Sequence, residues 1–452
     1  MRQWMVAAKK ADFYAIAEKF HVDPVVARII RNREVIGEKN IRIYLGGNLS
    51  DLSDPHQMKD MDRLVEILAQ KIRKQVHIRI IGDYDVDGVT SSHLFLTALR
   101  RVGAKVDVVI PHRIQDGYGL SLHLLQQAKE DGVDTILTCD NGIAAIDEIA
   151  WAKAQKMTVL VTDHHAVPFE EHEGRRTEKK SLADAVVNPH QQDCGYPYKE
   201  LCGAGVAWNV IRVLYENYDM DKREAEDLLD FVAMATVCDV MSLTGENRIL
   251  VKEGLKRIRH TKNIGLQALM QACNVQPENI SAYHFGYVLG PCVNATGRLD
   301  TARHALRLFE TGQETEAEEI ARDLVDLNQE RKELTLQGVE MAKKLCEEGG
   351  YENDPVLVLF LPDVHESIAG LIAGRIRETY QRPVFVLTRG EEGVKGSGRS
   401  IEAYSMFDKM TEVAELFTKY GGHPMAAGLS MREEDIDKLR EQLNQKAELS
   451  EE

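Results

Sequence analysis

The stretch VHIRIIGDYDVDGVTSSHLFLTALR, residues 76–100, decides the fold of this 452-residue chain. It opens with an apolar run at 76–82, continues through closely spaced acids and glycines, and then takes up a helical period. A strand that passes through a short polar turn into a helix is typical of a βαβ unit in a parallel sheet. The stretch therefore predicts a strand at 76–82 and a helix near 89–103.

The same alternation continues after this stretch. Short runs rich in Val and Ile predict four further strands, at 105–110, 134–139, 157–162 and 183–188. Between them, helical periods predict helices near 121–132 and 143–156, and the polar, charged segment 169–181 is predicted to be a loop. Helical patterns dominate from 203 to 272. The sequence thus predicts an α/β domain built on a parallel sheet.

A second domain is expected near the C-terminus. Residues 314–348 contain no proline and have apolar residues at three- and four-residue spacing, which predicts one long helix. Strand and helix patterns restart at 356–361 and 383–388. We expect a long helix that joins the parallel-sheet domain to a smaller α/β domain. The predicted domains are an N-terminal helical lead-in at 1–60, a catalytic domain at 61–312, the connecting helix at 313–350 and a substrate-binding domain at 351–445.

Composition narrows the class of protein. The seven cysteines are scattered without a C-x-x-C pair, which favours reduced, buried thiols. No run of about 18 apolar residues is present, so a cytoplasmic protein without a membrane span is expected. The formal net charge of −16 opposes a general affinity for polyanions, although bound cations would neutralise part of the acidic excess.

Acidic side chains follow three of the predicted strands. Asp83, Asp85 and Asp87 come after the first, Asp140 after the third, and Asp163 with His164 and His165 after the fourth. Each acid alone is equally compatible with a helix cap or a turn. The carboxyl ends of parallel strands meet at one edge of a sheet, however, and ligands bind there. The repetition therefore predicts a shared site.

Clustered carboxylates repel one another and lose solvation, so such a site implies bound cations. Oxygen ligands with one or two imidazoles suit Mg²⁺ or Mn²⁺, and the histidines favour Mn²⁺. Two such ions activate water and stabilise a phosphoryl transition state. The constellation predicts a two-metal phosphodiesterase.

Four motifs resemble those of the DHH phosphoesterase family, in the family's order: GDYDVDG at 82–88, CDNG at 139–142, DHH at 163–165 and TVCDVMSL at 236–243. Three further segments are similar to the RecJ-like branch of this family: LSDPHQMKDMDRLVEIL at 52–68, GAGVAWNVI at 203–211 and GPCVNATGRLDTA at 290–302. The segments VHESIAGLIAGRI at 364–376, GSGRS at 396–400 and GGHPMAAG at 421–428 resemble a DHHA1 domain. The resemblance covers roughly residues 50–432.

The resemblance implies roles for the acidic cluster. One ion would be held by four side chains and the other by two, with Asp140 as the bridge: Asp85, Asp140, His164 and Asp239, and Asp83 with Asp140. Asp87 and Asp163 would orient these ligands, and His165 would lie against the scissile phosphate as a catalytic group.

The resemblance also implies substrate contacts, which are Arg298, His365, Arg399, Ser400, Gly421, Gly422 and His423. Alternatives stay open for several of them. Arg298 could pair with Asp300, and His365 could be a buried structural histidine. The glycines of GSGRS and GGHPMAAG could let backbone N–H groups approach a phosphate, or they could form ordinary turns.

The implied function is a 5′-to-3′ exonuclease of RecJ type, acting on single-stranded DNA in repair and recombination with Mn²⁺ or Mg²⁺. Single-strand-binding protein and a helicase are candidate partners, and no membrane contact is expected. Two alternatives are a phosphodiesterase for short oligonucleotides or cyclic dinucleotides, and a non-catalytic replication or repair scaffold.

Three features depart from the family pattern. Residue 79 is arginine where some relatives have a histidine ligand, and Glu366 and Ser367 stand where a small residue and glycine are usual. The sequence ends soon after the DHHA1 motifs, so a C-terminal OB-fold is expected to be absent. That expectation keeps the short-oligonucleotide alternative open.

Overall fold

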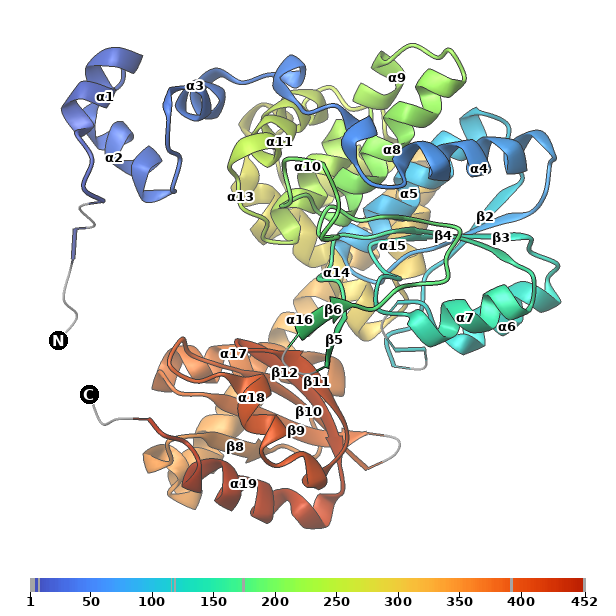
Figure 1. Ribbon diagram of the computed structural model, residues 1–452. Coiled ribbons are helices and arrows are strands. Elements are labelled where there is room, and N and C mark those ends of the chain that lie inside the picture. Colours follow the sequence, from blue (N-terminus) through green and yellow to red (C-terminus); the bar gives the residue numbers. More distant parts are fainter. Residues whose placement is uncertain are drawn as a thin grey trace. The chain divides into compact units, whose positions relative to one another are not determined.

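The computed structural model describes residues 5–6, 9–114, 116–117, 119–172, 175–390 and 393–449 (Figure 1). Residues 1–4 and 7–8 of the predicted lead-in and residues 173–174 of the predicted loop lie outside these ranges. The chain divides into two compact units, Met1–Val325 and Asp326–Glu452. The division falls within the helix α16 (Glu314–Gly349), which confirms the long helix predicted from the sequence.

The first unit is built on a five-stranded parallel sheet with the strand order β2-β1-β3-β4-β7. All five strands lie within the predicted segments: β1 (Ile78–Ile81), β2 (Val106–Val109), β3 (Thr135–Cys139), β4 (Thr158–Thr162) and β7 (Ala185–Val187). The chain moves from β1 outward to β2 and then returns to the other side of β1 as β3. This reversal makes the β1/β3 boundary the switch point at which ligands bind in such sheets.

Helices cover both faces of the sheet. On one face, Ile80 and Leu137 belong to the large core that also includes residues of α4, α5 and α8. On the other face, Ile136 and Val159 pack with α6 and α7. Strands buried on both sides are mostly apolar, which explains their Val- and Ile-rich runs. The covering helices are α4 (Met61–Arg73), α5 (Val86–Arg101), α6 (Leu122–Glu130), α7 (Ile146–Ala154) and α8 (Gly203–Asn217).

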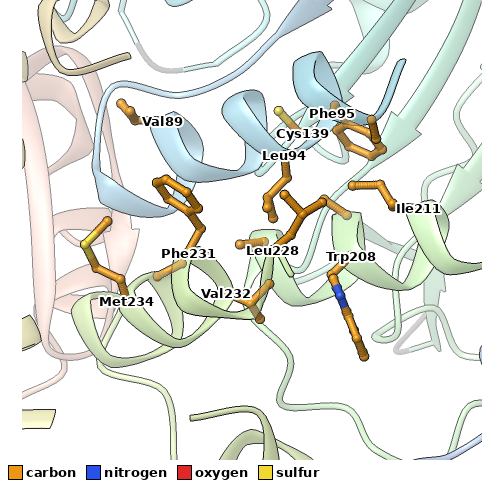
Figure 2. Packing of buried hydrophobic residues seen from close by; sticks show 14 of the residues in the cluster. Val89, Leu94, Phe95, Cys139, Trp208, Ile211, Leu228, Phe231, Val232 and Met234 are labelled. Carbon is orange, nitrogen blue, oxygen red and sulfur yellow. The ribbon is translucent and has the colours of Figure 1, made fainter. Parts of the chain in front are cut away.

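Helix α5 lies at the centre of this core, where it packs against α8 and α10 (Leu229–Cys238). Figure 2 shows Leu94 and Phe95 of α5 beside Ile211 of α8, with Phe231 of α10 to their left. The remaining helices of the unit are α1 (Phe13–Phe20), α2 (Pro24–Asn32), α3 (Glu38–Gly46), α9 (Arg223–Glu226), α11 (Gly245–Ile258), α12 (Ile264–Ala272), α13 (Ala282–His284), the π-helix η4 (Phe285–Leu289), α14 (Gly290–Leu299) and α15 (Ala302–Glu310).

The prediction of a loop at 169–181 is wrong in part. Strands β5 (Phe169–His172) and β6 (Arg175–Glu178) form an antiparallel hairpin there. The hairpin is a separate two-stranded sheet. Its charged residues therefore need no buried face, and the apolar alternation that signals a strand is missing.

The second unit has a mixed sheet with the order β11-β12-β10-β9-β8, in which β8 and β9 are parallel and the other neighbours are antiparallel. Its elements are β8 (Leu357–Phe360), η6 (Glu366–Ile368), α17 (Ala369–Tyr380), β9 (Val384–Gly390), β10 (Gly393–Arg399), α18 (Met406–Thr411), β11 (Phe417–His423), β12 (Ala426–Met431) and α19 (Ile436–Gln445). The predicted fold class, two α/β domains joined by a long helix, is confirmed. None of the described helices is both long and apolar enough to span a bilayer.

Arg79, one of the departures noted in the sequence, is a structural residue of β1. Its guanidinium donates to both carboxylate oxygens of Asp107, at 2.9 and 2.7 Å, and to Asp131 at 2.8 Å. Asp107 is the register partner of Arg79 on β2, so the ion pair fixes the pairing of the two strands. Burial raises the pKa of Asp107, but the hydrogen bonds and charge of Arg79 outweigh this effect and leave its pKa lowered.

Replacing Arg79 with Met should lower the free energy of unfolding by about 1–2 kcal/mol at neutral pH, because Asp107 is only partly buried and solvent screens part of the pair. A lowered carboxyl pKa contributes stability above its ordinary value of about 4, and this stability is lost as the pH falls through the lowered pKa. The loss should therefore shrink in acid. Urea unfolding at neutral and acidic pH measures both effects, with the exposed Arg259→Met as the control. Equal losses in the two variants would contradict this role.

Candidate metal centre

The turn between β1 and α5 presents three acids. Asp83 follows β1 directly and is buried, whereas Asp85 caps α5 by accepting a hydrogen bond from the Gly88 N–H at 3.0 Å. Asp87 lies in the first turn of α5 and is also buried. Its two oxygens accept from the N–H groups of Gly203 and Ala204 at 2.6 and 2.7 Å. The first turn of α8 therefore neutralises part of its charge.

Asp140 follows β3 at the switch point. Its φ of 61° is left-handed, a conformation that Asp adopts more readily than most residues. The next side chain, Asn141, donates to the carbonyls of Ile81 and Cys139 at 3.0 and 2.9 Å. The ends of β1 and β3 are thereby tied together, and Asp140 is held beside the β1 turn.

The DHH triplet follows β4. Asp163 accepts from the backbone N–H groups of Ile143, His164 and His165, and it also bonds Nδ1 of His165 at 2.7 Å. Its oxygens are thus fully used in positioning the two histidines. His164 points Nε2 at three carboxylates, 3.1 Å from Asp140 and 3.6 Å from both Asp87 and Asp239.

Asp239 caps the C-terminus of α10, and the residue after it is strained. Val240 has a φ of 58°, which a β-branched side chain rarely adopts, and it is 87% exposed. Strain of this kind persists only where the surrounding structure enforces it, and it gathers at functional sites.

Three groups of side chains present ligand atoms within 4.8 Å of one another: Asp83, Asp85 and Asp140; Asp140, His164 and His165; and Asp87, His164 and Asp239. All the predicted ligands thus come together, although Asp85 is grouped with Asp83 and not with His164. Asp140 belongs to two of the groups, and so does His164. The geometry fits two neighbouring ions that share ligands.

The electrostatics of the centre require cations. Burial, and then the charges of neighbouring aspartates, raise the pKa of Asp83 and Asp140 well above its ordinary value. The same causes raise the pKa of Asp239 to about 8. Burial alone lowers the pKa of His165, but Asp163 and the other nearby carboxylates raise it to about 9.

Two buried polar atoms support a metal-ion fit. Asp83 Oδ1 and His164 Nε2 have no hydrogen-bond partner among the described residues. Such atoms are rare in folded proteins, because each forfeits its hydration without a replacement. A carboxylate oxygen and an imidazole nitrogen at this spacing are the donors that Mn²⁺ and Mg²⁺ accept.

The second unit gathers several of the predicted substrate residues at the ends of neighbouring strands. Arg399 on β10 and His423 on β11 both pair with Ala426 of β12, so they flank one position of the sheet. The guanidinium of Arg399 also lies over Gly370 in the first turn of α17, where a Cβ atom would come within 2.9 Å of Nη2. His365 is exposed, so the alternative of a buried histidine is wrong, and its Nδ1 lies 2.7 Å from Ser367 Oγ.

The predicted glycines and Ser400 differ in their surroundings. Gly396 and Gly398 face the core, where a Cβ would come within 2.5 Å of Leu387 and 2.2 Å of Met406, so packing explains them. Gly422 has a φ of 155° and its Cβ would clash with the Ala426 carbonyl, whereas Gly421 has open space. Ser400 is fully buried and donates to the carbonyl of Tyr404 at 2.5 Å.

Two tyrosines beside the centre were not predicted from the sequence. Tyr283 and Tyr287 are 62% and 73% exposed, and their rings stack with centroids 5.2 Å apart. Tyr283 lies in α13 and Tyr287 in the π-helix η4, which packs on the end of α10. There Cys238, the residue before Asp239, has its Sγ 3.3 Å from the Phe285 carbonyl. Their four-residue spacing was the available signal, but it also fits an ordinary helix.

Arg113 was missed as well. It follows β2 and stacks over the ring of Tyr84, with Cζ 4.7 Å from the ring centroid. Its charge lowers the pKa of Asp83, against the larger effect of burial. Its position after β2, at the sheet edge that carries the acidic cluster, was a usable signal, but the sequence prediction for that edge rested on acidic residues and histidines alone.

Comparison with known proteins shows the family. The DHH family, N-terminal domain, matches residues 77–236, and the DHHA1 domain matches residues 353–449. The chain is 36% identical over 440 residues to the single-stranded-DNA-specific exonuclease RecJ of Haemophilus influenzae, covering 93% of this chain and 74% of that protein. The chain belongs to the RecJ family.

Two further RecJ proteins support this assignment. RecJ of Bacillus subtilis is 34% identical over 436 residues, which cover 96% of this chain but only 53% of that longer protein. A crystal structure of exonuclease RecJ bound to manganese superposes with a TM-score of 0.75 at 31% identity, covering 87% of this chain and 96% of that one. The resemblance drawn from the four motifs is confirmed.

Gly203 offers a test of how closely the RecJ-type centre is packed. A Cβ there would lie 2.6 Å from Asp140 Cβ and 2.8 Å from Oδ1, so Gly203→Ala must displace Asp140 or the start of α8. We expect Mn²⁺ affinity to fall by about 10- to 100-fold, the range for disturbed support of metal ligands. Isothermal titration calorimetry measures this.

The matched control is Gly205→Ala on the same helix, whose Cβ would meet only the side chain of Leu201, at 3.3 Å or more. It should bind Mn²⁺ as the wild type does. Equal affinities in both variants would show that the approach of α8 to Asp140 is unimportant.

Proposed function

We propose that this chain is a two-metal, Mn²⁺- or Mg²⁺-dependent exonuclease that releases nucleotides from the 5′ end of single-stranded DNA. The observation that carries the proposal is the convergence of three ligand groups, sharing Asp140 and His164, at the switch point of the parallel sheet. The RecJ proteins to which the chain is similar are named for the same substrate.

We assign the metal ligands from their contacts. Asp83 and Asp85 would hold one ion, His164 and Asp239 would hold the other, and Asp140, which belongs to two of the ligand groups, would contribute to both. Asp163 and Asp87 position these ligands through hydrogen bonds. Asp163 orients both histidines, and Asp87 attaches the cluster to the first turn of α8.

Two bound divalent cations would activate the attacking water and stabilise the negative charge that develops on the phosphoryl oxygens. His165 is suited to a separate task. It is partly exposed at the edge of the cluster, and its Nδ1 bonds Asp163 at 2.7 Å, which orients the ring. With a proton on Nε2, the ring can hold a phosphoryl oxygen or protonate the leaving oxygen.

The strand would be guided to this cluster by the residues around it. Arg298 and Arg113 supply positive charge beside the β1 turn, since both act on the Tyr84 hydroxyl. Tyr283 and Tyr287 form an exposed platform on which successive bases can stack without regard to sequence. In the second unit, Arg399 and His423 are the proposed phosphate contacts, and His365, Ser400, Gly421 and Gly422 stay predictions of the family resemblance.

The cellular setting follows the same resemblance. We propose a role in DNA repair and recombination in the cytoplasm, with single-strand-binding protein or a helicase as the supplier of single strands. Co-purification of either protein with the tagged chain would test the partnership.

The proposed activity is tested by incubating the purified chain with Mn²⁺ and strands labelled at the 5′ or the 3′ end. Early release of mononucleotides from the 5′ label, with a duplex resisting, is the expected outcome. Faster turnover of a two- to five-nucleotide oligomer than of a long strand would instead favour the short-oligonucleotide alternative. Asp140→Ala at saturating Mn²⁺ should lose at least about a thousandfold in rate, because both ions lose a ligand. Retained hydrolysis would rule out the shared-ligand mechanism.

The tyrosine platform has its own test. Tyr283→Ala with Tyr287→Ala should raise KM for a long strand by about tenfold or more, since stacking contributes about 1–3 kcal/mol for each base. Turnover of a dinucleotide too short to reach the platform should not change. Tyr14→Ala removes a comparably exposed tyrosine and serves as the control. An unchanged KM for the long strand would exclude the platform from the substrate path.

A further inference from the structure

A second concave site lies in the first unit, away from the metal cluster. It is a cavity of about 880 Å³ between α5, α10, α15 and the segment that joins α11 to α12. Small-molecule sites in proteins span about 300–1,000 Å³. Helix α5 belongs to both sites, because its first turn carries Asp87 and its later turns line the cavity with His93, Thr97 and Arg100.

Polar atoms on three sides of this cavity lack partners within the described part of the chain. They are His93 Nδ1 on α5, Arg257 Nε on α11 and Glu310 Oε1 on α15. His93 is only 6% exposed, so bulk water reaches it poorly. Buried polar atoms are nearly always hydrogen-bonded, and three unsatisfied ones around one cavity indicate that something outside the chain bonds to them.

One end of the cavity is built to accept an anion. Helix α12 begins there at Ile264. The Asn263 side chain accepts the Leu266 N–H at 2.9 Å, and the earlier N–H groups have no carbonyl partner within the helix. Lys262 stands just before this helix, Arg100 of α5 also lines the cavity, and both residues are exposed. The lining holds five Lys/Arg and four Asp/Glu, a small positive excess in a chain whose net charge is −16.

The other end is suited to a flat ring with hydrogen-bonding edges. His93 packs beside Phe231 and Phe309, with ring centroids 4.4 and 5.9 Å away. Burial, with the charge of Arg100, lowers the pKa of His93 to about 3, so the ring is neutral and offers one donor and one acceptor. Glu310 adds an acceptor oxygen on the facing wall.

We propose that this cavity binds a nucleoside monophosphate. The phosphate lies at the start of α12 beside Lys262 and Arg100, and the base reaches inward to His93 and Glu310. This assignment does not depend on the proposed exonuclease activity, because neither the metal cluster nor hydrolysis takes part in it.

The test is calorimetric titration of the full chain with dAMP and with inorganic phosphate in buffer containing EDTA. EDTA removes cations from the acidic cluster, and the cavity variants then show whether dAMP binds in the cavity. We expect dAMP to bind at least about tenfold more tightly than phosphate, since the base adds hydrogen bonds to buried groups. The double variant Arg100→Ala with Lys262→Ala should weaken dAMP by about tenfold or more. Arg259→Ala, an exposed arginine of the same region outside the lining, should have no effect.

Two more variants distinguish binding in the cavity from binding at the metal cluster and from binding of the phosphate group alone. Asp140→Asn should bind dAMP unchanged, and loss of binding there would assign the nucleotide to the metal cluster. His93→Phe keeps a buried ring but removes both nitrogens, so its affinity for dAMP should fall toward that for phosphate. Melting temperatures identify any variant that fails to fold. The proposal is overturned if dAMP does not bind, or if dAMP and phosphate bind equally well.

Discussion

The repulsion among buried carboxylates at the β1/β3 boundary is the constraint on which the rest of the first unit depends. Burial raises the pKa of Asp83, Asp85, Asp140 and Asp239, and the charges of neighbouring aspartates raise it further, so bound cations would relieve the repulsion. Two further acids, Asp87 and Asp163, add their charge to this repulsion, but their oxygens are engaged in hydrogen bonds. Asp87 and Asp163 use their oxygens on N–H donors, which leaves the remaining four for the ions.

Backbone geometry determines which acids are held by N–H donors and which are left to bind the ions. The first turn of α8 contributes two N–H groups to Asp87, and it comes so close to Asp140 that position 203 has no room for a side chain. The left-handed turn at Asp140 and the strained Val240 after Asp239 set the direction of two more ligands. The ligands are thus positioned by helix termini, tight turns and a sheet edge together, and no single sequence motif is sufficient.

Much of the fold was predictable because strands buried on both faces are mostly apolar, and β1, β3 and β4 were visible as short runs rich in Ile, Leu and Val. The candidate ligands were predictable because parallel strands bring their carboxyl ends together. The hairpin at 169–178 was not predicted because the alternation of apolar and polar residues is missing, and Phe169, Glu170, Glu171 and Thr177 are all exposed. The stacked pair Tyr283 and Tyr287 was not predicted, because residues four apart are also common in an ordinary helix. The assignment of Asp85 to one ion or the other depends on side-chain directions, which spacing does not contain.

The glycines of the first motif show that one short segment serves both helix packing and metal binding. In GDYDVDG, a Cβ at Gly82 would lie 2.0 Å from Ser92 Oγ, and one at Gly88 would lie 2.5 Å from the backbone of Asp83. Small residues therefore let α5 come close over the end of β1. That closeness brings the acids before and within α5 to the same point as Asp140. A sequence pattern that indicates ligand chemistry is thus equally a description of helix-to-strand packing, and neither could change without the other.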